Sequence, residues 1–172
     1  MSGLLKALSR FERTVCIIAF AVMAIALMAD VVSRRLFATG LIGATEVAVY
    51  GMIAVAMFGI GIATDAGAHL RPRFLDAIFP RAWRDGVQRL AYATTALFFA
   101  IFAGLSAWMV AESFVLGDRT EILRAPVWAL QSMILVGFAT NMLRFAVYAA
   151  RPGLAPRDEV EAALEDIREE GA

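Results

Sequence analysis

The sequence predicts an all-α integral membrane protein with four transmembrane helices. Three observations predict this fold class: 60% of the 172 residues are hydrophobic, the mean hydropathy is +0.70, and the apolar residues gather in four blocks separated by charged stretches. Uncharged blocks of about 20 residues match the hydrocarbon thickness of a bilayer, whereas a soluble helix or strand alternates apolar with polar residues. Each block is therefore interpreted as one span.

The four predicted spans cover about residues 14–33, 44–64, 89–112 and 125–149. Asp30 is the only charged residue of the first span, and the third span is uncharged from Leu90 to Ala111. In the fourth, Pro126 stands where the first turn of a helix accepts proline, and Trp128 is of the type that anchors at the interface. At a rise of 1.5 Å per residue, each span is about long enough to cross the bilayer.

The first block also has features of a cleaved signal peptide. A basic start precedes an apolar run, and the small-residue triplet at 24–26 resembles a cleavage site. The apolar run continues past that triplet to Ala29, which is longer than the apolar region of a typical signal peptide. The sequence therefore favours retention of this block as a helix.

The distribution of Lys and Arg predicts that both termini face the cytoplasm. Twelve of the sixteen basic residues lie before the first span, between spans two and three, or from Arg144 onward. The other four, Arg34, Arg35, Arg119 and Arg124, lie in the first and third connections. Because cytoplasmic segments carry the excess of positive charge, these two short connections are expected to face outward.

Two segments outside the spans have the pattern of amphipathic helices that lie in the membrane interface. Residues 4–11 place their apolar side chains on one helical face, while Lys6 and Arg10 fall mostly elsewhere. In the middle connection, Pro72 and Pro80 bracket a second pattern of this kind. A solvated loop with scattered apolar residues is the alternative for that second segment.

The end of the chain differs in composition from the rest. Pro152 and Pro156 make a linker, and seven acidic residues follow within 158–170. We therefore divide the chain into a transmembrane domain, residues 1–151, and an acidic cytoplasmic tail, residues 152–172. A solvated appendage is the simpler interpretation of such a tail.

Ionisable residues beside lipid are costly, so each one in or near a span is a candidate for function. Asp30 precedes Arg34 by four residues, a spacing that favours a structural ion pair near the end of the first span. Glu46 opens the second span, where the helix dipole favours a carboxylate. Asp65 and His69 share the four-residue spacing at the other end of that span, and a lone interfacial histidine is more often an anchor than a catalyst.

The sequence lacks the residue patterns of several function classes. The single Cys16 cannot form an intramolecular disulfide, and the single His69 cannot supply two axial haem ligands. Ser106 and Ser132 lie in spans without an evident partner base, and a glycine-rich phosphate loop is absent. Sixteen basic and sixteen acidic residues give no electrostatic basis for binding nucleic acid. We expect no enzymatic activity, cofactor or metal.

Small residues recur at four-residue intervals in two of the predicted spans. Ala96, Ala100 and Gly104 do so in the third span, and Gly59 and Ala63 do so in the second. This spacing places small residues on one helical face and allows two backbones to approach closely. We expect the helices to associate with one another.

Short motifs along the chain resemble those of a known family. Residues 34–37 read Arg-Arg-Leu-Phe, 42–46 read Ile-Gly-Ala-Thr-Glu, 58–59 read Phe-Gly, 67–71 read Gly-Ala-His-Leu-Arg, and 123–128 read Leu-Arg-Ala-Pro-Val-Trp. Their order and spacing resemble the small permease subunit of tripartite ATP-independent periplasmic (TRAP) transporters, the DctQ-like family, up to about Arg151. Many members of that family have a tryptophan and a second acidic residue beside the position of Glu46, and this chain has neither.

The resemblance implies a non-enzymatic subunit of a sodium-driven importer in a bacterial inner membrane. In that family a periplasmic protein captures an organic acid, such as a C4-dicarboxylate, and the large permease subunit carries the substrate and cation sites. The implied partners are the large permease subunit, the periplasmic substrate-binding protein and membrane lipids. The candidate partner or lipid contacts are polar and aromatic residues beside the spans: Arg34, Arg35, Glu46, His69, Arg71, Arg119, Arg124 and Trp128.

Two other functions remain open from the sequence. A self-sufficient small dimeric secondary transporter would use Asp30 as its ion-coupling carboxylate, although such a design favours a charge near mid-membrane and short connections. A quinone- or haem-linked membrane anchor would need ligands that the histidine count argues against.

Overall fold

The computed structural model describes residues 2–65 and 84–155, which form four long α-helices and one short 3-10 turn. The helices are α1 (Ser2–Phe37), α2 (Ala44–Asp65), α4 (Arg84–Leu116) and α5 (Val127–Ala150), and the turn η2 covers Pro152–Leu154. All four helices are long and apolar enough to cross a membrane. The prediction of an all-α chain with four membrane-length helices is confirmed.

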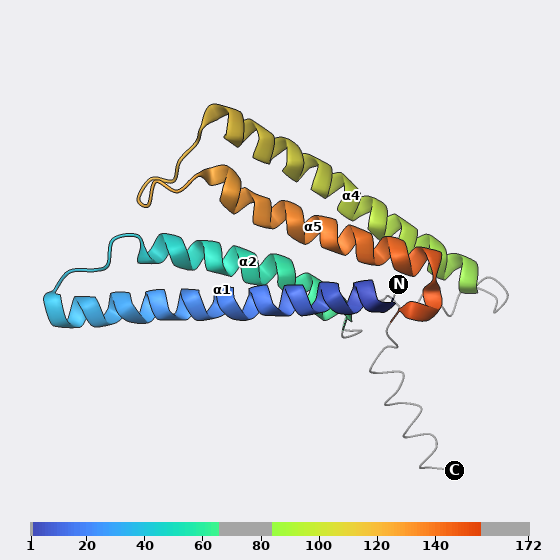
Figure 1. The fold of residues 1–172 in the computed structure, drawn as a ribbon, viewed down its shortest axis with the longest axis horizontal. Coiled ribbons are helices and arrows are strands. Elements are labelled where there is room, and N and C mark those ends of the chain that lie inside the picture. Colours follow the sequence, from blue (N-terminus) through green and yellow to red (C-terminus); the bar gives the residue numbers. More distant parts are fainter. Residues whose placement is uncertain (1, 66–83, 156–172) are drawn as a thin grey trace, which may run out of the picture.

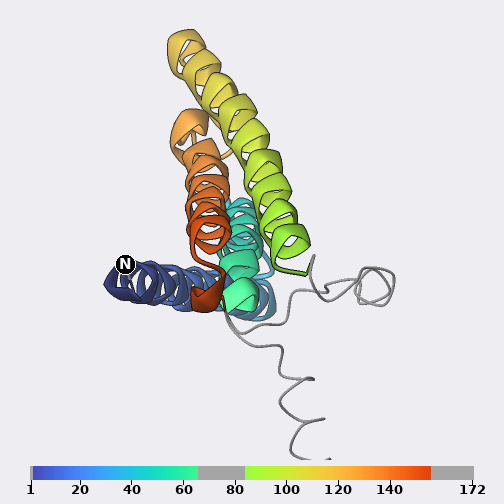
Figure 2. The ribbon, with the colours of Figure 1, turned by 90° about the vertical axis from the view of Figure 1, so that its right-hand side faces the viewer.

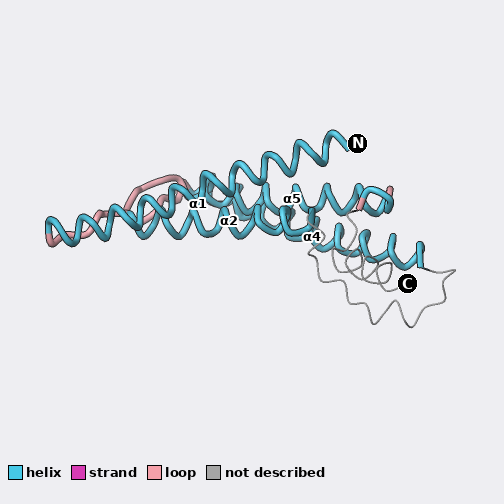
Figure 3. Tube along the Cα trace, turned by 90° about the horizontal axis from the view of Figure 1, so that it is seen from below, coloured by secondary structure: helices cyan, strands magenta, loops and turns pink. Residues whose placement is uncertain are grey.

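The described helices contact one another in the order α1, α2, α5, α4. Helix α1 packs along α2, α4 packs along α5, and α2 contacts α5, so that two hairpins lie side by side. Figure 1 shows the α4–α5 hairpin slanted relative to the α1–α2 hairpin, with α5 between α4 and α2, and Figure 2 shows α4 and α5 side by side above α1. Seen from below in Figure 3, the beginnings of α1 and α4 diverge to opposite sides.

The two ends of this arrangement are distinct. Residues 38–43 and 117–126 connect the helices at one end, the hairpin end, whereas α1 begins and α5 ends at the other, the terminal end (Figure 1). Within their most apolar windows, α1 is only 6% buried and α4 is 17% buried, against 28% for α2 and 33% for α5. The outer helices therefore present most of their apolar side chains to the surroundings, as a membrane protein does.

Helix α1 is longer than a bilayer is thick. Its 36 residues form one continuous helix, which extends for about 54 Å at 1.5 Å per residue against about 30 Å of hydrocarbon. Residues 4–11 are the first turns of this helix, and Leu5 among them is buried. The placement of these turns in the membrane interface stays a prediction.

An aromatic cluster fills the terminal end between the helices. Phe99 of α4 stacks on Phe145 of α5 with ring centroids 5.6 Å apart, and Tyr148 meets Phe145 edge-on at 6.1 Å. Leu5 of α1 belongs to the same buried cluster. Because aromatic rings bury large apolar areas, this cluster holds α1 to the α4–α5 hairpin.

The helices approach closely at glycines other than those that the sequence predicted. The helices associate as predicted, and Ala96 of the small-residue pattern packs against the buried cluster, but Gly59 and Gly104 have open space where a Cβ would stand. A Cβ at Gly137 would instead lie 2.9 Å from the Cβ of Met57, and Gly51 approaches α1 as closely. Small residues at four-residue spacing are common in spans, and tertiary packing decides which of them meet a neighbour.

Several predicted features lie outside the described residues. They are the amphipathic segment of the middle connection with Pro72 and Pro80, the candidate contacts His69 and Arg71, and the acidic residues of the tail.

Candidate functional site

A fully buried ion pair joins α1 to α5. Glu12 and Arg144 are both 0% exposed, and Arg144 Nη2 donates to Glu12 Oε2 at 2.6 Å. The Arg144 guanidinium also donates to the carbonyl of Gly61 on α2 and, at 3.4 Å, to Ser9 Oγ. We call Ser9, Glu12, Gly61 and Arg144 the buried junction. It connects three helices and both hairpins.

The buried junction depends on a glycine. A Cβ at Gly61 would overlap the carboxylate of Glu12, so only a residue without a side chain leaves room for the ion pair. Glu12 Oε1 and Arg144 Nε are buried without a hydrogen-bond partner among the described residues. Burying two charges costs free energy that their attraction only partly offsets, and removing one partner leaves an uncompensated charge. The junction therefore fixes the mutual position of the helices more than it adds to net stability.

The structure corrects the assignment of Arg144. From the sequence, Arg144 is expected to be a cytoplasmic charge, but it lies inside α5 and is fully buried. Six hydrophobic residues follow it within the helix, which is the signal that it lies inside the span. Without Arg144, eleven basic residues still stand against four on the opposite side, so the predicted orientation is unchanged.

Glu12 is a functional candidate that the sequence pattern did not single out. Arg10 and Arg13 lie close to it in sequence, so an acidic residue at this position is expected to be exposed like its charged neighbours. Its position carries a signal nevertheless: it follows the buried Leu5 by seven residues, or about two helical turns, and so shares the apolar face of α1.

A second set of polar contacts lies at the hairpin end. Asp30 accepts two hydrogen bonds, from Arg34 Nε at 2.9 Å and from the backbone N–H of Leu41 at 2.7 Å. Glu46 Oε2 accepts the backbone N–H of Leu123 at 3.0 Å, across 77 residues of sequence. We call Asp30, Leu41, Glu46 and Leu123 the hairpin junction. Its second bond joins α2 to the connection between α4 and α5.

The connection at 117–126 is folded so that it reaches α2. Helix α4 ends at Leu116, and the positive φ of 68° at the next residue, Gly117, permits the N–H of Asp118 to bond back to the carbonyl of Ser113 at 3.2 Å. The two sides of the turn are then joined by a hydrogen bond from the Thr120 N–H to the carbonyl of Ala125 at 2.9 Å. This closed turn presents the backbone of Leu123 to the carboxylate of Glu46.

The predicted pair of Asp30 and Arg34 is confirmed, and the side chain of Arg34 is 64% exposed. The helix dipole alone does not explain Glu46, because its carboxylate also holds the opposite turn. The described candidate contacts all lie at the hairpin end: Arg34, Arg35, Glu46, Arg119, Arg124 and Trp128. Among them, Arg119 donates to the carbonyl of Arg124 at 3.2 Å.

Trp128 is separate from these polar contacts. Its ring meets Phe114 of α4 edge-on, with centroids 5.6 Å apart and an interplanar angle of 78°. Pro126, predicted in the first turn, is the N-cap residue that precedes α5. The aromatic pair fixes the start of α5 against the end of α4.

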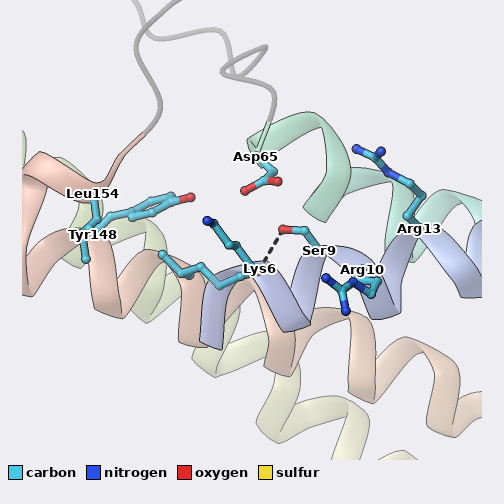
Figure 4. Close-up of a pocket in the computed structure, with 8 residues that line it drawn as sticks. Lys6, Ser9, Arg10, Arg13, Asp65, Tyr148 and Leu154 are labelled. Carbon is cyan, nitrogen blue, oxygen red and sulfur yellow. Dashed lines mark hydrogen bonds between the residues drawn. The ribbon is translucent and has the colours of Figure 1, made fainter. Parts of the chain in front are cut away.

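A cavity of about 460 Å³ opens at the terminal end beside the buried junction (Figure 4). It is lined by residues of α1, α2, α5 and the following turn: Leu5, Lys6, Ser9, Arg10, Arg13, Asp65, Tyr148 and Leu154. In Figure 4, Lys6 extends toward the hydroxyl of Tyr148 and the carboxylate of Asp65. Ser9 links this cavity to the buried junction through Arg144.

Within residues 2–65 and 84–155, no group of three or more His, Cys, Asp or Glu residues is placed to hold a metal ion.

Residues 8–152 match a protein family described as tripartite ATP-independent periplasmic transporters, DctQ component. The chain belongs to this family. The match begins within the first turns of α1 and ends just after α5, so it includes both junctions. Comparisons with curated proteins and with solved structures found no match. The resemblance inferred from the motifs is confirmed, and the chain is a multi-pass membrane component of a transporter rather than of an enzyme.

Proposed function

We propose that this chain is the small scaffold subunit of a sodium-driven, binding-protein-dependent importer of organic acids, C4-dicarboxylates or related carboxylates. It packs against the large permease subunit, which carries the substrate and the cation. The family match over residues 8–152 is the observation that carries this proposal. The importer resides in a bacterial inner membrane, with both termini of this chain in the cytoplasm.

The geometry of the two junctions supports a scaffold. A transport domain that moves across the membrane needs a partner that does not deform, and packed helices with fixed polar contacts resist deformation. The buried junction fastens the hairpins near the terminal end, and the bond from Leu123 to Glu46 fastens them at the hairpin end. Two hairpins that are fastened both near the terminal end and at the hairpin end rotate against each other less than hairpins fastened at one end only.

The hydrogen bonds of Asp30 argue against a self-sufficient transporter. An ion-coupling carboxylate must release its partners to bind a cation, and such groups lie near mid-membrane. Asp30 lies near the end of α1 and accepts bonds from both Arg34 and Leu41. Its carboxylate therefore serves the fold of the first connection.

The hairpin end is the proposed contact region for the periplasmic substrate-binding protein or for outward loops of the large subunit. Arg34, Arg35, Arg119 and Arg124 are all exposed there. Exposed cations at one end steer an oppositely charged partner and set its orientation. If Arg34→Ala and Glu46→Ala both leave assembly and uptake unchanged, this part of the proposal is wrong.

Co-purification tests the scaffold role. The tagged chain is expressed together with its chromosomal neighbours, extracted in detergent and separated by size exclusion. We expect a fixed ratio of this chain to a much larger polytopic protein, and uptake in liposomes only when both are present with the binding protein and a sodium gradient. Recovery of this chain as a homodimer that catalyses Asp30-dependent uptake by itself contradicts the proposal.

The single cysteine makes the orientation testable. In a Cys16→Ser background, Arg124→Cys places one thiol at the hairpin end, and Arg151→Cys places one at the terminal end; both positions are exposed. A membrane-impermeant maleimide added to cells with a permeabilised outer membrane is expected to label the first variant and not the second. The reverse pattern would invert the proposed topology.

A further inference from the structure

The cavity at the terminal end carries more positive than negative charge. Lys6, Arg10 and Arg13 line it from successive turns of α1, and Asp65 of α2 is the one carboxylate among its lining residues. Within the described part of the chain, none of the three cations takes part in an ion pair. An anion in this cavity would therefore meet cations that have no other described partner.

The neighbouring buried junction does not supply the missing negative charge. Glu12 lies on the same helix, but its carboxylate pairs with Arg144 at 2.6 Å and both residues are fully buried. The two charges of that pair offset each other. The positive charge of Lys6, Arg10 and Arg13 is therefore left for a partner from outside the described fold.

The position of the cavity along α1 places it at the level of lipid headgroups. The uncharged stretch of α1 begins at Thr14, directly after Arg13, and extends to Ala29. That stretch accounts for most of the hydrocarbon thickness, so the first 13 residues of the chain extend toward the polar layer of one leaflet. Cations there have phosphate groups at high local concentration.

The lining also suits the part of a lipid that joins headgroup to acyl chains. Leu5 and Leu154 give the cavity an apolar side, while Ser9 and the hydroxyl of Tyr148 supply polar groups beside the cations. A free inorganic anion would make no use of an apolar side, whereas a glycerophospholipid presents phosphate oxygens and hydrocarbon together.

We propose that this cavity is a binding site for the headgroup of an anionic glycerophospholipid. Arg10 and Arg13 attract the phosphate through their positive charge, and Lys6 meets it between Asp65 and Tyr148. The first glycerol and acyl carbons lie against Leu5 and Leu154. Because three cations and one carboxylate line the cavity, an anionic headgroup offsets its net positive charge better than a zwitterionic headgroup does.

The test measures lipid binding to the full-length purified chain by native mass spectrometry in detergent. Phosphatidylglycerol, phosphatidylcholine and inorganic phosphate are titrated separately. Arg10→Gln/Arg13→Gln is compared with Arg89→Gln/Arg151→Gln, which removes the same charge from exposed arginines that do not line the cavity. Far-UV circular dichroism and thermal unfolding confirm that all variants are folded.

The expected result is preferential binding of phosphatidylglycerol over phosphatidylcholine. Arg10→Gln/Arg13→Gln should weaken it on the order of thirtyfold, since each cation near an anionic lipid contributes roughly fivefold. The control double variant should change it less than about threefold. Equal weakening by both double variants would indicate general charge attraction and overturn the proposal. So would equally tight binding of inorganic phosphate, or equal binding of phosphatidylcholine.

One more variant separates a lipid from the chain's own acidic tail as occupant. Deletion of residues 156–172 removes the seven acidic side chains that follow Leu154 and Ala155 in sequence. Phosphatidylglycerol binding that is present in the full chain and persists after the deletion supports the lipid site. Binding that appears only after the deletion assigns the cavity to the tail. Neither outcome depends on the proposed transport function, which co-purification tests separately.

Discussion

The buried junction and the Glu46–Leu123 bond of the hairpin junction both join the α1–α2 hairpin to the α4–α5 hairpin, but they differ in exposure and in the type of partner. In the first, two side chains of opposite charge, Glu12 and Arg144, meet at 0% exposure. In the second, the carboxylate of Glu46 meets a backbone N–H of an exposed turn. A lost contact is replaced by water at the hairpin end but not at the buried junction. Breaking a contact is therefore expected to lower the free energy of unfolding more at the buried junction than at the hairpin end.

The largest effect is expected from unpairing the buried junction. Arg144→Met leaves Glu12 as an uncompensated buried carboxylate and should lower the free energy of unfolding by about 3–5 kcal/mol. Glu12→Met/Arg144→Met removes both charges and should recover most of that loss. Unfolding is followed by circular dichroism in mixed micelles of increasing SDS content, with Arg89→Met as the exposed control.

The double variant decides the interpretation. If it is as unstable as Arg144→Met alone, the loss comes from the missing hydrogen bonds to Gly61 and Ser9 rather than from the unpaired charge. The buried junction would then stabilise the protein through hydrogen bonds, as the hairpin junction does.

A smaller effect is expected from crowding the buried junction while both charges remain. A methyl group at Gly61 overlaps the Glu12 carboxylate, so Gly61→Ala should cost about 1–3 kcal/mol as the ion pair shifts. Gly59→Ala, two residues away, meets open space and should stabilise α2 by up to about 1 kcal/mol. The same unfolding measurement compares them, and equal effects of the two substitutions would show that the close approach at Gly61 is not required.

The hairpin junction should respond locally. Glu46→Ala removes the acceptor for the Leu123 N–H, and Asp30→Ala removes the acceptor for the Leu41 N–H. Each should cost about 1 kcal/mol of stability, because water reaches the exposed turns. Hydrogen exchange is expected to accelerate at Leu123 only in the first variant and at Leu41 only in the second. Accelerated exchange at both amides in either variant would mean that the two bonds form one cooperative unit.

The smallest effect is expected for the exposed partner of Asp30. Arg34→Ala leaves the bond from Leu41 to Asp30 in place, and the Arg34 side chain is 64% exposed. Its loss should therefore change the free energy of unfolding by less than about 1 kcal/mol. Hydrogen exchange at Leu41 should stay as in the parent chain. A loss as large as that of Asp30→Ala would show that the guanidinium orients the carboxylate.

The contrast between the two junctions also marks the limit of what local sequence reveals. The pair of Asp30 and Arg34 was predictable because a spacing of four residues fixes two side chains on one helical face. The contacts of Glu46 with Leu123 and of Glu12 with Arg144 join residues 77 and 132 positions apart. No helical periodicity relates such residues, so their pairing depends on how the hairpins pack.

The sequence by itself determined the four apolar helices, the family and the excess of basic residues at one side, because bilayer thickness and charge distribution act on each segment separately. Tertiary structure alone decided that Arg144 is a buried partner rather than a cytoplasmic charge. It also decided that Gly51, Gly61 and Gly137, rather than Gly59 and Gly104, lie against other helices. The physical reason is that burial and close approach depend on two surfaces in contact. The sequence of a single helix specifies only one of these two surfaces.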